Sequence, residues 1–441
     1  MKKIVLSAIA ALTIGSVAAT AGDVKLYSDS NGQVFTQAGE GRTAIKSEDT
    51  SVFAKTSKLE FSGTHYFGLT SSNPKTDTTE TLANGGDQSK YAATSTGFEM
   101  RRNYVQVKAF LMDDPKSYYR VTFDATKELA SSTSHANAYV KYAYLYLNNV
   151  LPATGVEVGI VHRPWIDYEE HNSWFYRSFN KVMIEEKGTA NESGVDLINS
   201  ADLGFNLKTK TEFFSSEIGL FNGEGYHADK DAANQENSGD LSLEWRLTGH
   251  LLGSGKTLGK NDRTKDTYAN LSTFGLMSKN HKDNDAALDQ VASAALKSEY
   301  DRSFYGIHAV YNQPLFLLAA QYLVAKDDAQ EATIAANWEK REYKALSLNG
   351  EIRPIKDWTI IGRYDNYVME DTDVSGADMT SSVKGNKIIA GLAYKMNKNV
   401  SFIASGKFIN EEYTTASATY ADGSDTGHSK NVYMLTTEVK W

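Results

Sequence analysis

Residues 433–441 at the end of the chain read YMLTTEVKW. Successive side chains of an extended strand point to opposite faces, so residues two apart share a face. One face of this stretch is mostly apolar and carries Tyr433, Leu435, Thr437, Val439 and Trp441. The other face carries Met434, Thr436, Glu438 and Lys440. The pattern predicts a β-strand with one apolar face, one largely polar face and an aromatic residue at its end.

The same alternation recurs along nearly the whole chain. In one segment Val121 and Phe123 alternate with Arg120, Thr122 and Asp124. We expect about 16 such strands, an even number, as in single-chain bacterial barrels. They are predicted near 59–69, 104–111, 118–125, 139–148, 156–161, 201–208, 214–221, 240–247, 267–277, 299–312, 315–325, 341–353, 358–367, 387–396, 401–409 and 431–441. The expected fold is all-β, a transmembrane antiparallel β-barrel over residues 59–441.

Connection lengths support this fold, because outer-membrane barrels alternate short periplasmic turns with long outer loops. Long polar stretches are found at 70–97, 126–138, 326–340, 368–386 and 410–429. Short connections lie between them at 112–117, 149–155, 313–314, 354–357 and 397–399. One connection, 248–266, falls where a short turn is expected and is not short.

The N-terminal residues have the features of an export signal. Lys2 and Lys3 precede an apolar run over 4–14, and residues 19–21 read ATA, so we expect a signal peptide over 1–21. Residues 22–58 are predicted to form a periplasmic or pore-lining extension, with a hairpin around Asn31-Gly32. The expected location is the outer membrane of a Gram-negative bacterium. No later apolar run has the length of a transmembrane helix.

The connection at 162–200, the third outer loop in chain order, is the candidate pore constriction. Its aromatic residues need a surface to pack against, and the inside of a barrel offers one. If the loop folds inward, its charges would set ion selectivity. The charged candidates are Arg163, Asp167, Glu169, Glu170, Arg177, Lys181, Glu185 and Glu186. The alternatives are an external loop packed on its neighbours and a contact between subunits.

Charged residues on the predicted inward faces of the strands are the candidates for the pore lining. The basic ones are Arg102, Lys108, Arg120, Lys208, Arg246 and Arg363. The acidic ones are Asp124, Asp202, Glu244 and Asp365. Both signs are present, so the lining alone predicts weak selectivity.

Three segments resemble the porins related to the phosphate-selective porin O and P group. They are Arg101-Arg102-Asn103-Tyr104, the strand 156–161 followed by Arg163-Pro164-Trp165, and Tyr176-Arg177-Ser178-Phe179. The second segment contains a Gly-x-x-x-x-Pro stretch from Gly159 to Pro164. The resemblance implies a 16-stranded barrel that assembles as a trimer and a third loop that constricts the pore. The family's ladder of basic residues is diluted here by acidic ones. We therefore expect a general porin for small ions and solutes, with an anion-selective or phosphate-selective channel as the alternative.

The final strand resembles the signal that bacterial outer-membrane proteins present to the barrel-assembly machinery, with Tyr433 and Trp441 as its aromatic positions. Outer-membrane lipid and lipopolysaccharide are further expected partners. A net charge of −9 argues against nucleic acid. We expect no cofactor, no metal and no enzyme activity. A barrel hydrolase is the competing class, and His65, His135 and His171 show no clear pairing with a serine or aspartate.

Overall fold

The computed structural model describes residues 27–29, 34–35, 37–44, 59–77, 95–110, 114, 116–126, 137–186, 194–223, 225, 241–259, 261–282, 299–329, 340–372, 380–415 and 425–441. The chain divides into two compact units, residues 1–60 and residues 61–441. The predicted signal peptide lies outside the described residues and stays a prediction.

The first unit contains three short strands, β1 (Tyr27–Ser28), β2 (Val34–Phe35) and β3 (Thr43–Ala44). They form an antiparallel sheet in the order β2-β1-β3. Tyr27 lies opposite Phe35, which fits the expected hairpin, while its turn at Asn31-Gly32 lies outside the described residues. The role of this extension is still a prediction.

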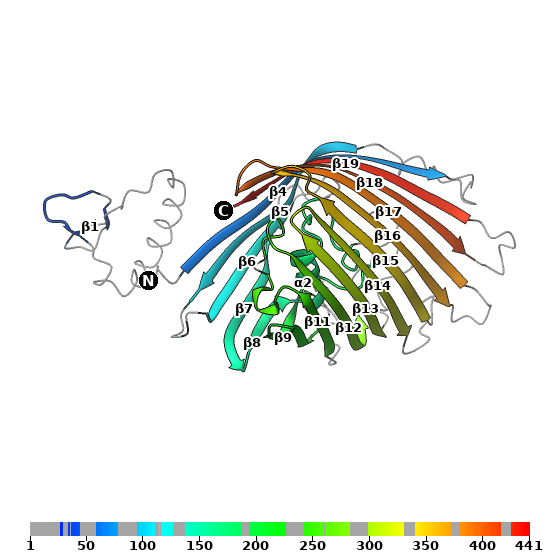
Figure 1. The fold of residues 1–441 in the computed structure, drawn as a ribbon, viewed down its shortest axis with the longest axis horizontal. Coiled ribbons are helices and arrows are strands. Elements are labelled where there is room, and N and C mark those ends of the chain that lie inside the picture. The colour runs from blue at the N-terminus through cyan, green and yellow to red at the C-terminus, as the bar shows by residue number, and fades with distance from the viewer. Residues whose placement is uncertain are drawn as a thin grey trace. The chain divides into compact units, whose positions relative to one another are not determined.

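The second unit is a closed antiparallel barrel of sixteen strands, β4 to β19, as predicted. Each strand pairs with the next in the chain, and β19 pairs with β4 to close the barrel (Figure 1). The first eight are β4 (Leu59–Asp77), β5 (Ser95–Ala109), β6 (Tyr118–Thr126), β7 (Asn137–Leu151), β8 (Thr154–His162), β9 (Ala201–Lys210), β10 (Phe214–Phe221) and β11 (Ser242–Leu252). The others are β12 (Tyr268–Lys282), β13 (Glu299–Gln313), β14 (Phe316–Ala329), β15 (Lys340–Ile352), β16 (Trp358–Thr372), β17 (Thr380–Lys395), β18 (Val400–Thr415) and β19 (Asp425–Lys440).

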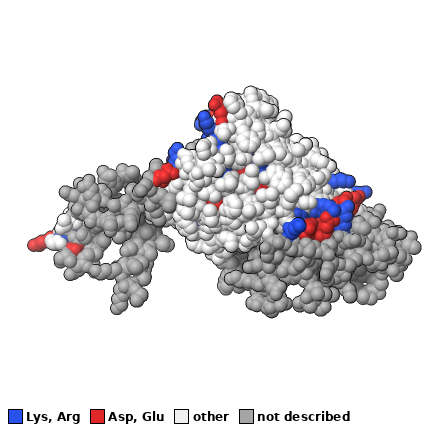
Figure 2. Space-filling view, turned by 90° about the horizontal axis from the view of Figure 1, so that it is seen from below, with Lys and Arg blue, Asp and Glu red and all other residues white. Residues whose placement is uncertain are grey.

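Burial follows the two-residue period of the sequence. Along β15, buried residues alternate with more exposed ones from Lys340 to Ile352. The exposed faces of other strands carry large apolar side chains, such as Ile307 and Leu318, which are 60% and 59% exposed. On the face drawn in Figure 2, charged residues gather near the edges of the described surface and leave a broad area almost without charge. An apolar exposed surface of this extent needs a nonpolar environment.

Trp441 takes part in the closing seam, which is the pairing of β19 with β4. Trp441 and Gly63 exchange backbone hydrogen bonds of 3.1 and 3.0 Å. The Trp441 indole Nε1–H donates to His65 Nε2 at 2.9 Å. A side chain at position 63 would meet the indole ring, because a Cβ there would lie 2.5 Å from it. The terminal residue is therefore built into the β19–β4 pairing.

Two connections described by the structure contain helical turns. The β8–β9 connection contains the helix α2 (Pro164–Asn172), and the β11–β12 connection contains the 3₁₀ turn η3 (Gly255–Thr257). Within the described ranges, no helix combines the length and apolar character needed to cross a membrane. The β11–β12 connection is longer than the turns at 152–153 and 314–315, so the irregularity seen in the sequence is also present in the structure.

Candidate pore constriction

The β8–β9 connection starts at a buried arginine that lies between two carboxylates. Arg163 has an extended backbone at the N-terminus of α2, and Pro164, which needs no backbone hydrogen bond, occupies the first turn. The Arg163 guanidinium donates to Asp202 of β9 at 2.6 Å and lies 2.9 Å from Glu244 of β11. Leaving such a buried charge unpaired would be costly, so these carboxylates fix the direction in which the connection leaves the strand.

A second arginine ties the connection to itself. Arg177 donates to Glu170 of α2 and to both carboxylate oxygens of Glu185, with a distance of 2.7 Å from Nη2 to Oε1. Burial would raise the pKa of Glu185, but Arg177 and Lys181 outweigh it and hold that pKa below its ordinary value. Glu185 is therefore ionised at neutral pH, and its pairing with Arg177 brings residues 170–185 together.

Hydrogen bonds join the connection to strands on the opposite part of the barrel. Arg302 of β13 donates to the Leu197 carbonyl at 2.8 Å, and Arg363 of β16 donates to the Lys181 carbonyl at 2.7 Å. The Tyr268 hydroxyl, at the start of β12, donates to the Asn172 carbonyl at 2.8 Å. These strand positions lie near one end, in the middle and near the other end of the strands, so the connection contacts the wall over much of its height.

Apolar packing accompanies these bonds. The Trp165 ring stacks on Phe274 of β12, with ring centroids 3.7 Å apart. One buried cluster joins the connection to the buried sides of β12–β19. The connection contributes Trp165, Ile166, Tyr168, Trp174, Tyr176, Phe179, Val182, Met183, Ile184, Val195, Leu197 and Ile198. The strands contribute Phe274, Leu276, Phe304, Leu323, Ala325, Tyr343, Ala345, Ile361, Tyr367, Val383, Ile389, Ile403, Val432 and Met434.

The side of the connection that faces β4–β8 borders a cavity instead. This cavity has a volume of about 450 Å³. From the connection it is lined by Ile166, Asp167, Glu170, His171, Trp174, Phe175, Arg177 and Ser200. Its strand wall includes Tyr66, Tyr104, Gln106, Lys108, Arg120, Thr122, Lys141, Tyr142 and His162. Six lysines and arginines but only two carboxylates line it, so its formal charge is positive.

The basic residues of this wall lie against tyrosines. The Arg120 guanidinium lies 4.9 Å from the centre of the Tyr142 ring and donates to the Tyr144 hydroxyl at 3.1 Å. The Lys141 ammonium donates to the Tyr104 hydroxyl at 3.1 Å. These cation–π contacts and hydrogen bonds fix the positions of the Arg120 and Lys141 side chains in the wall.

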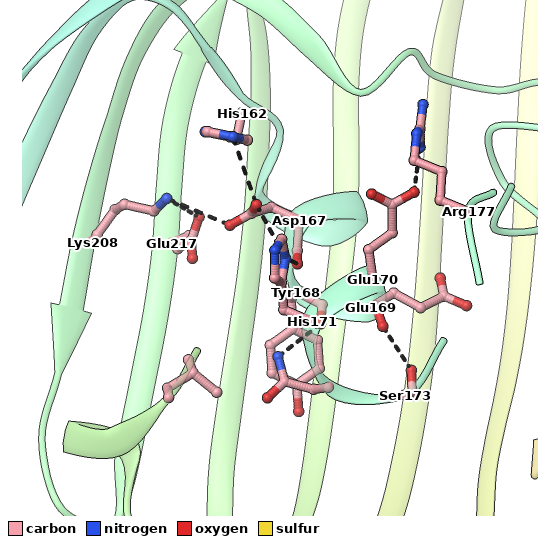
Figure 3. A network of polar contacts seen from close by, with 12 residues as sticks. His162, Asp167, Tyr168, Glu169, Glu170, His171, Ser173, Arg177, Lys208 and Glu217 are labelled. Carbon is pink, nitrogen blue, oxygen red and sulfur yellow. Dashed lines mark hydrogen bonds and ion pairs between the residues drawn. The ribbon is translucent and has the colours of Figure 1, made fainter. Parts of the chain in front are cut away.

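Asp167 is held among basic groups on the same cavity (Figure 3). Its carboxylate lies 3.8 Å from His162, 3.4 Å from His171 and 3.8 Å from Lys208. Burial would raise the pKa of Asp167, but His162, His171 and Lys208 outweigh it and lower that pKa. Lys208 also pairs with Glu157 at 3.2 Å. Lys208 also lies 3.4 Å from Glu217, so Asp167 shares this one ammonium group with two other carboxylates.

The predicted constriction residues take up different positions. Asp167, Glu170 and Arg177 line the cavity, whereas Arg163, Glu169, Glu185 and Glu186 are buried and Lys181 is partly buried. Burial raises the pKa of Glu169 to about 8. Of the residues predicted on inward strand faces, Lys108 and Arg120 line the cavity. The others form ion pairs, namely Arg102–Asp124, Arg163–Asp202, Arg163–Glu244, Lys208–Glu157, Arg246–Glu217 and Arg363–Asp365.

Reasoning from the sequence missed Lys141, Tyr142 and Arg263 of the cavity lining. The β6–β7 register shifts between Thr122 and Phe123, opposite Tyr142 and Val140. Such a bulge lets two consecutive residues face the same side, and Lys141 and Tyr142 are both buried. A strict two-residue alternation places consecutive residues on opposite faces, so it could not predict Lys141 and Tyr142 on the same side. Within the described residues, no three histidine, aspartate or glutamate side chains come together as possible metal ligands.

No protein-family model matches the chain, and no curated protein matches it. Solved structures share its fold. The anion-selective porin from Comamonas acidovorans is 11% identical, aligned over 87% of this chain and 99% of that one, with a TM-score of 0.52. The outer-membrane protein OmpT of Vibrio cholerae is 13% identical over 87% of this chain and 97% of that one, also with a TM-score of 0.52. At these identities the likeness shows the barrel fold.

Proposed function

We propose that this protein is an outer-membrane porin, a water-filled channel for small hydrophilic solutes and ions. The observation that carries the proposal is the polar cavity between residues 163–200 and strands β4–β8 of a closed barrel. The exposed faces of that barrel are apolar and suited to lipid. The proposed location is the outer membrane of a Gram-negative bacterium, reached through cleavage of residues 1–21.

In this proposal the β8–β9 connection folds into the barrel and forms the constriction. Its packing on the buried sides of β12–β19 supports this placement, because the outer sides of the same strands are exposed. The apolar cluster occupies that half of the interior, so the water path follows β4–β8. A path lined by charged and hydroxyl groups lets hydrated solutes pass without tight binding.

The lining favours anions over cations. Six lysines and arginines line the passage, Lys108, Arg120 and Lys141 of the strand wall among them, against the two carboxylates Asp167 and Glu170. Net positive charge in a narrow passage attracts anions and repels cations. This arrangement supports the anion-preferring form of the porin over a neutral one. The fold is shared with an anion-selective porin.

Planar-bilayer recording of the purified protein tests the proposal directly. Stepwise conductance that rises with salt concentration is the expected result, and no conductance at all would refute the function. In a salt gradient, the sign of the reversal potential should report anion preference. A cation-preferring potential would contradict the assigned lining.

A saturable block by one solute would instead identify a substrate-selective channel. Hydrolysis of ester or peptide substrates by the purified protein would identify a barrel enzyme, and we expect none. Among the three histidines considered from the sequence, His65 bonds to Trp441 and Asn103, His171 lies against Asp167, and His135 is outside the described residues.

The proposed assembly is a homotrimer in contact with lipid and lipopolysaccharide. The exposed apolar belt offers the area for both kinds of contact. Tyr433 and Trp441 are about half exposed, which suits recognition of the last strand by the barrel-assembly machinery before the seam closes. Crosslinking of the folded protein in detergent would report the number of subunits.

A further inference from the structure

The described residues of the β11–β12 connection, 253–259 and 261–267, have a conformation fixed by their own hydrogen bonds. The Ser254 side chain accepts from the Lys256 amide at the start of η3. Asp262 accepts from the Thr264 amide and hydroxyl at 3.0 and 2.7 Å. Side chains that satisfy nearby backbone groups in this way stabilise a turn. The connection is therefore a folded element and not merely a longer loop.

Neighbouring strands hold this element on both sides. The Gly255 amide donates to the Glu212 carbonyl at 2.9 Å, and Lys210 donates to the Leu258 carbonyl at 3.1 Å. From the other side, the Asn312 side chain donates to the carbonyls of Arg263 and Asp266 at 3.0 and 2.7 Å. Leu258 is buried in the cluster that contains the β8–β9 connection.

Arg263 extends from this element to the β8–β9 connection. Its guanidinium lies 4.0 Å from the centre of the Phe175 ring and 5.4 Å from that of Tyr176. Its Nε lies 3.2 Å from Glu351 of β15, whose carboxylate also accepts from Arg353 at 2.6 Å. Arg263 also lines the cavity. The Arg263 side chain thus contacts the β8–β9 connection and β15, and it also lines the cavity.

We infer that the β11–β12 connection is a second pore element, which clamps the constriction from the end of the barrel that carries the short turns. Arg263 is the positioning residue of this clamp. It holds residues 175–176 through cation–π contacts. Because Arg263 and Arg353 share the single carboxylate of Glu351, the group leaves net positive charge at that end of the passage. The inference rests on the proposed porin function and extends it. Residues 253–267 break the alternation of loop lengths because the clamp requires the additional chain.

Three full-length variants test this inference. Arg263→Met keeps an unbranched, flexible side chain and removes the guanidinium with its charge. Arg263→Lys keeps the charge without the planar group, and Lys256→Gln is the control in the same connection. We expect Arg263→Met to lower the anion-to-cation permeability ratio about twofold and to increase open-channel current noise. Arg263→Lys should restore the ratio while the noise stays high. Lys256→Gln should behave like the wild type.

Hydrogen–deuterium exchange of the folded protein tests the clamp without conductance. Backbone amides of the peptide that contains Phe175 and Tyr176 should exchange faster in Arg263→Met than in the wild type and in Lys256→Gln. Wild-type noise, ratio and exchange rate in Arg263→Met would overturn the clamp and leave the porin function standing. A non-conducting wild-type protein would refute the porin function, and the exchange rates would still decide whether the two connections are coupled.

Discussion

Glu169 and Glu170 are adjacent in α2 but lie in different surroundings. Glu170 lines the cavity and pairs with Arg177, whereas Glu169 is 1% exposed. Consecutive residues of a helix point about 100° apart, so one carboxylate reaches the cavity and the other the packed side. The sequence shows two acids together, but only the helix orientation separates them.

Glu169→Gln should therefore change the pH dependence of stability and not the conductance. The folded-state pKa of about 8 lies above the ordinary value of a glutamate. The folded protein then holds this proton more tightly than the unfolded chain, so stability is highest below the ordinary pKa and falls as pH rises toward 8. For the wild type we expect a loss of roughly a few kcal/mol over that window. A glutamine removes this titration, so the variant should show a flatter profile.

Urea unfolding at pH 5 and pH 8, followed by the gel mobility of the folded barrel, measures this effect. Glu170→Gln is the matched control, because its carboxylate lies on the cavity side and pairs with Arg177. An unchanged pH profile in Glu169→Gln would show that this carboxyl group is not the one that titrates.

At the scale of elements, the β8–β9 connection shows which packing contacts the sequence can predict and which it cannot. Its length and aromatic content predict an element packed against a surface, and the structure places Trp165 on Phe274 and Tyr268 on Asn172. The partner surface could not be predicted, because barrel interiors are expected to be polar and the buried sides of β12–β19 carry apolar residues. Alternation identifies two faces of a strand. It does not say which face meets another element of the chain.

Trp165→Ala tests whether this packing holds the constriction in place. Removing a buried Trp side chain costs about 3–5 kcal/mol, and here the loss falls on the contact between the connection and β12. The barrel strands keep their pairing, so the variant should fold and show a larger, noisier conductance. Single-channel recording makes the comparison. Trp358→Ala, which removes a 37% exposed ring from β16, is the control and should conduct like the wild type. A wild-type current in Trp165→Ala would mean that the connection does not limit the passage.

At the scale of the whole molecule, the sequence predicts the barrel topology but not the difference between the β12–β19 side and the β4–β8 side. The number of strands, their order and their antiparallel closure follow from a period of two and from loop lengths that can be read in the sequence. The apolar cluster over β12–β19 and the charged cavity along β4–β8 both depend on where the described residues of the β8–β9 connection pack. Contacts such as that between Arg302 and Leu197 join residues far apart in the chain, and no local pattern records them.

Closure of the barrel joins its first and last strands, and Gly63 and Trp441 test it together. A methyl group at position 63 would overlap the Trp441 indole, which lies 2.5 Å from the Cβ position. The indole would have to turn away and give up its 2.9 Å bond to His65, at a cost of about 1 kcal/mol. Gly63→Ala should therefore lower the urea midpoint of the folded barrel. In a Trp441→Ala background there is no ring to displace, so adding Gly63→Ala should change little. The double-mutant cycle measures this coupling, and additive effects would show that Gly63 is needed for the backbone alone and not for the indole.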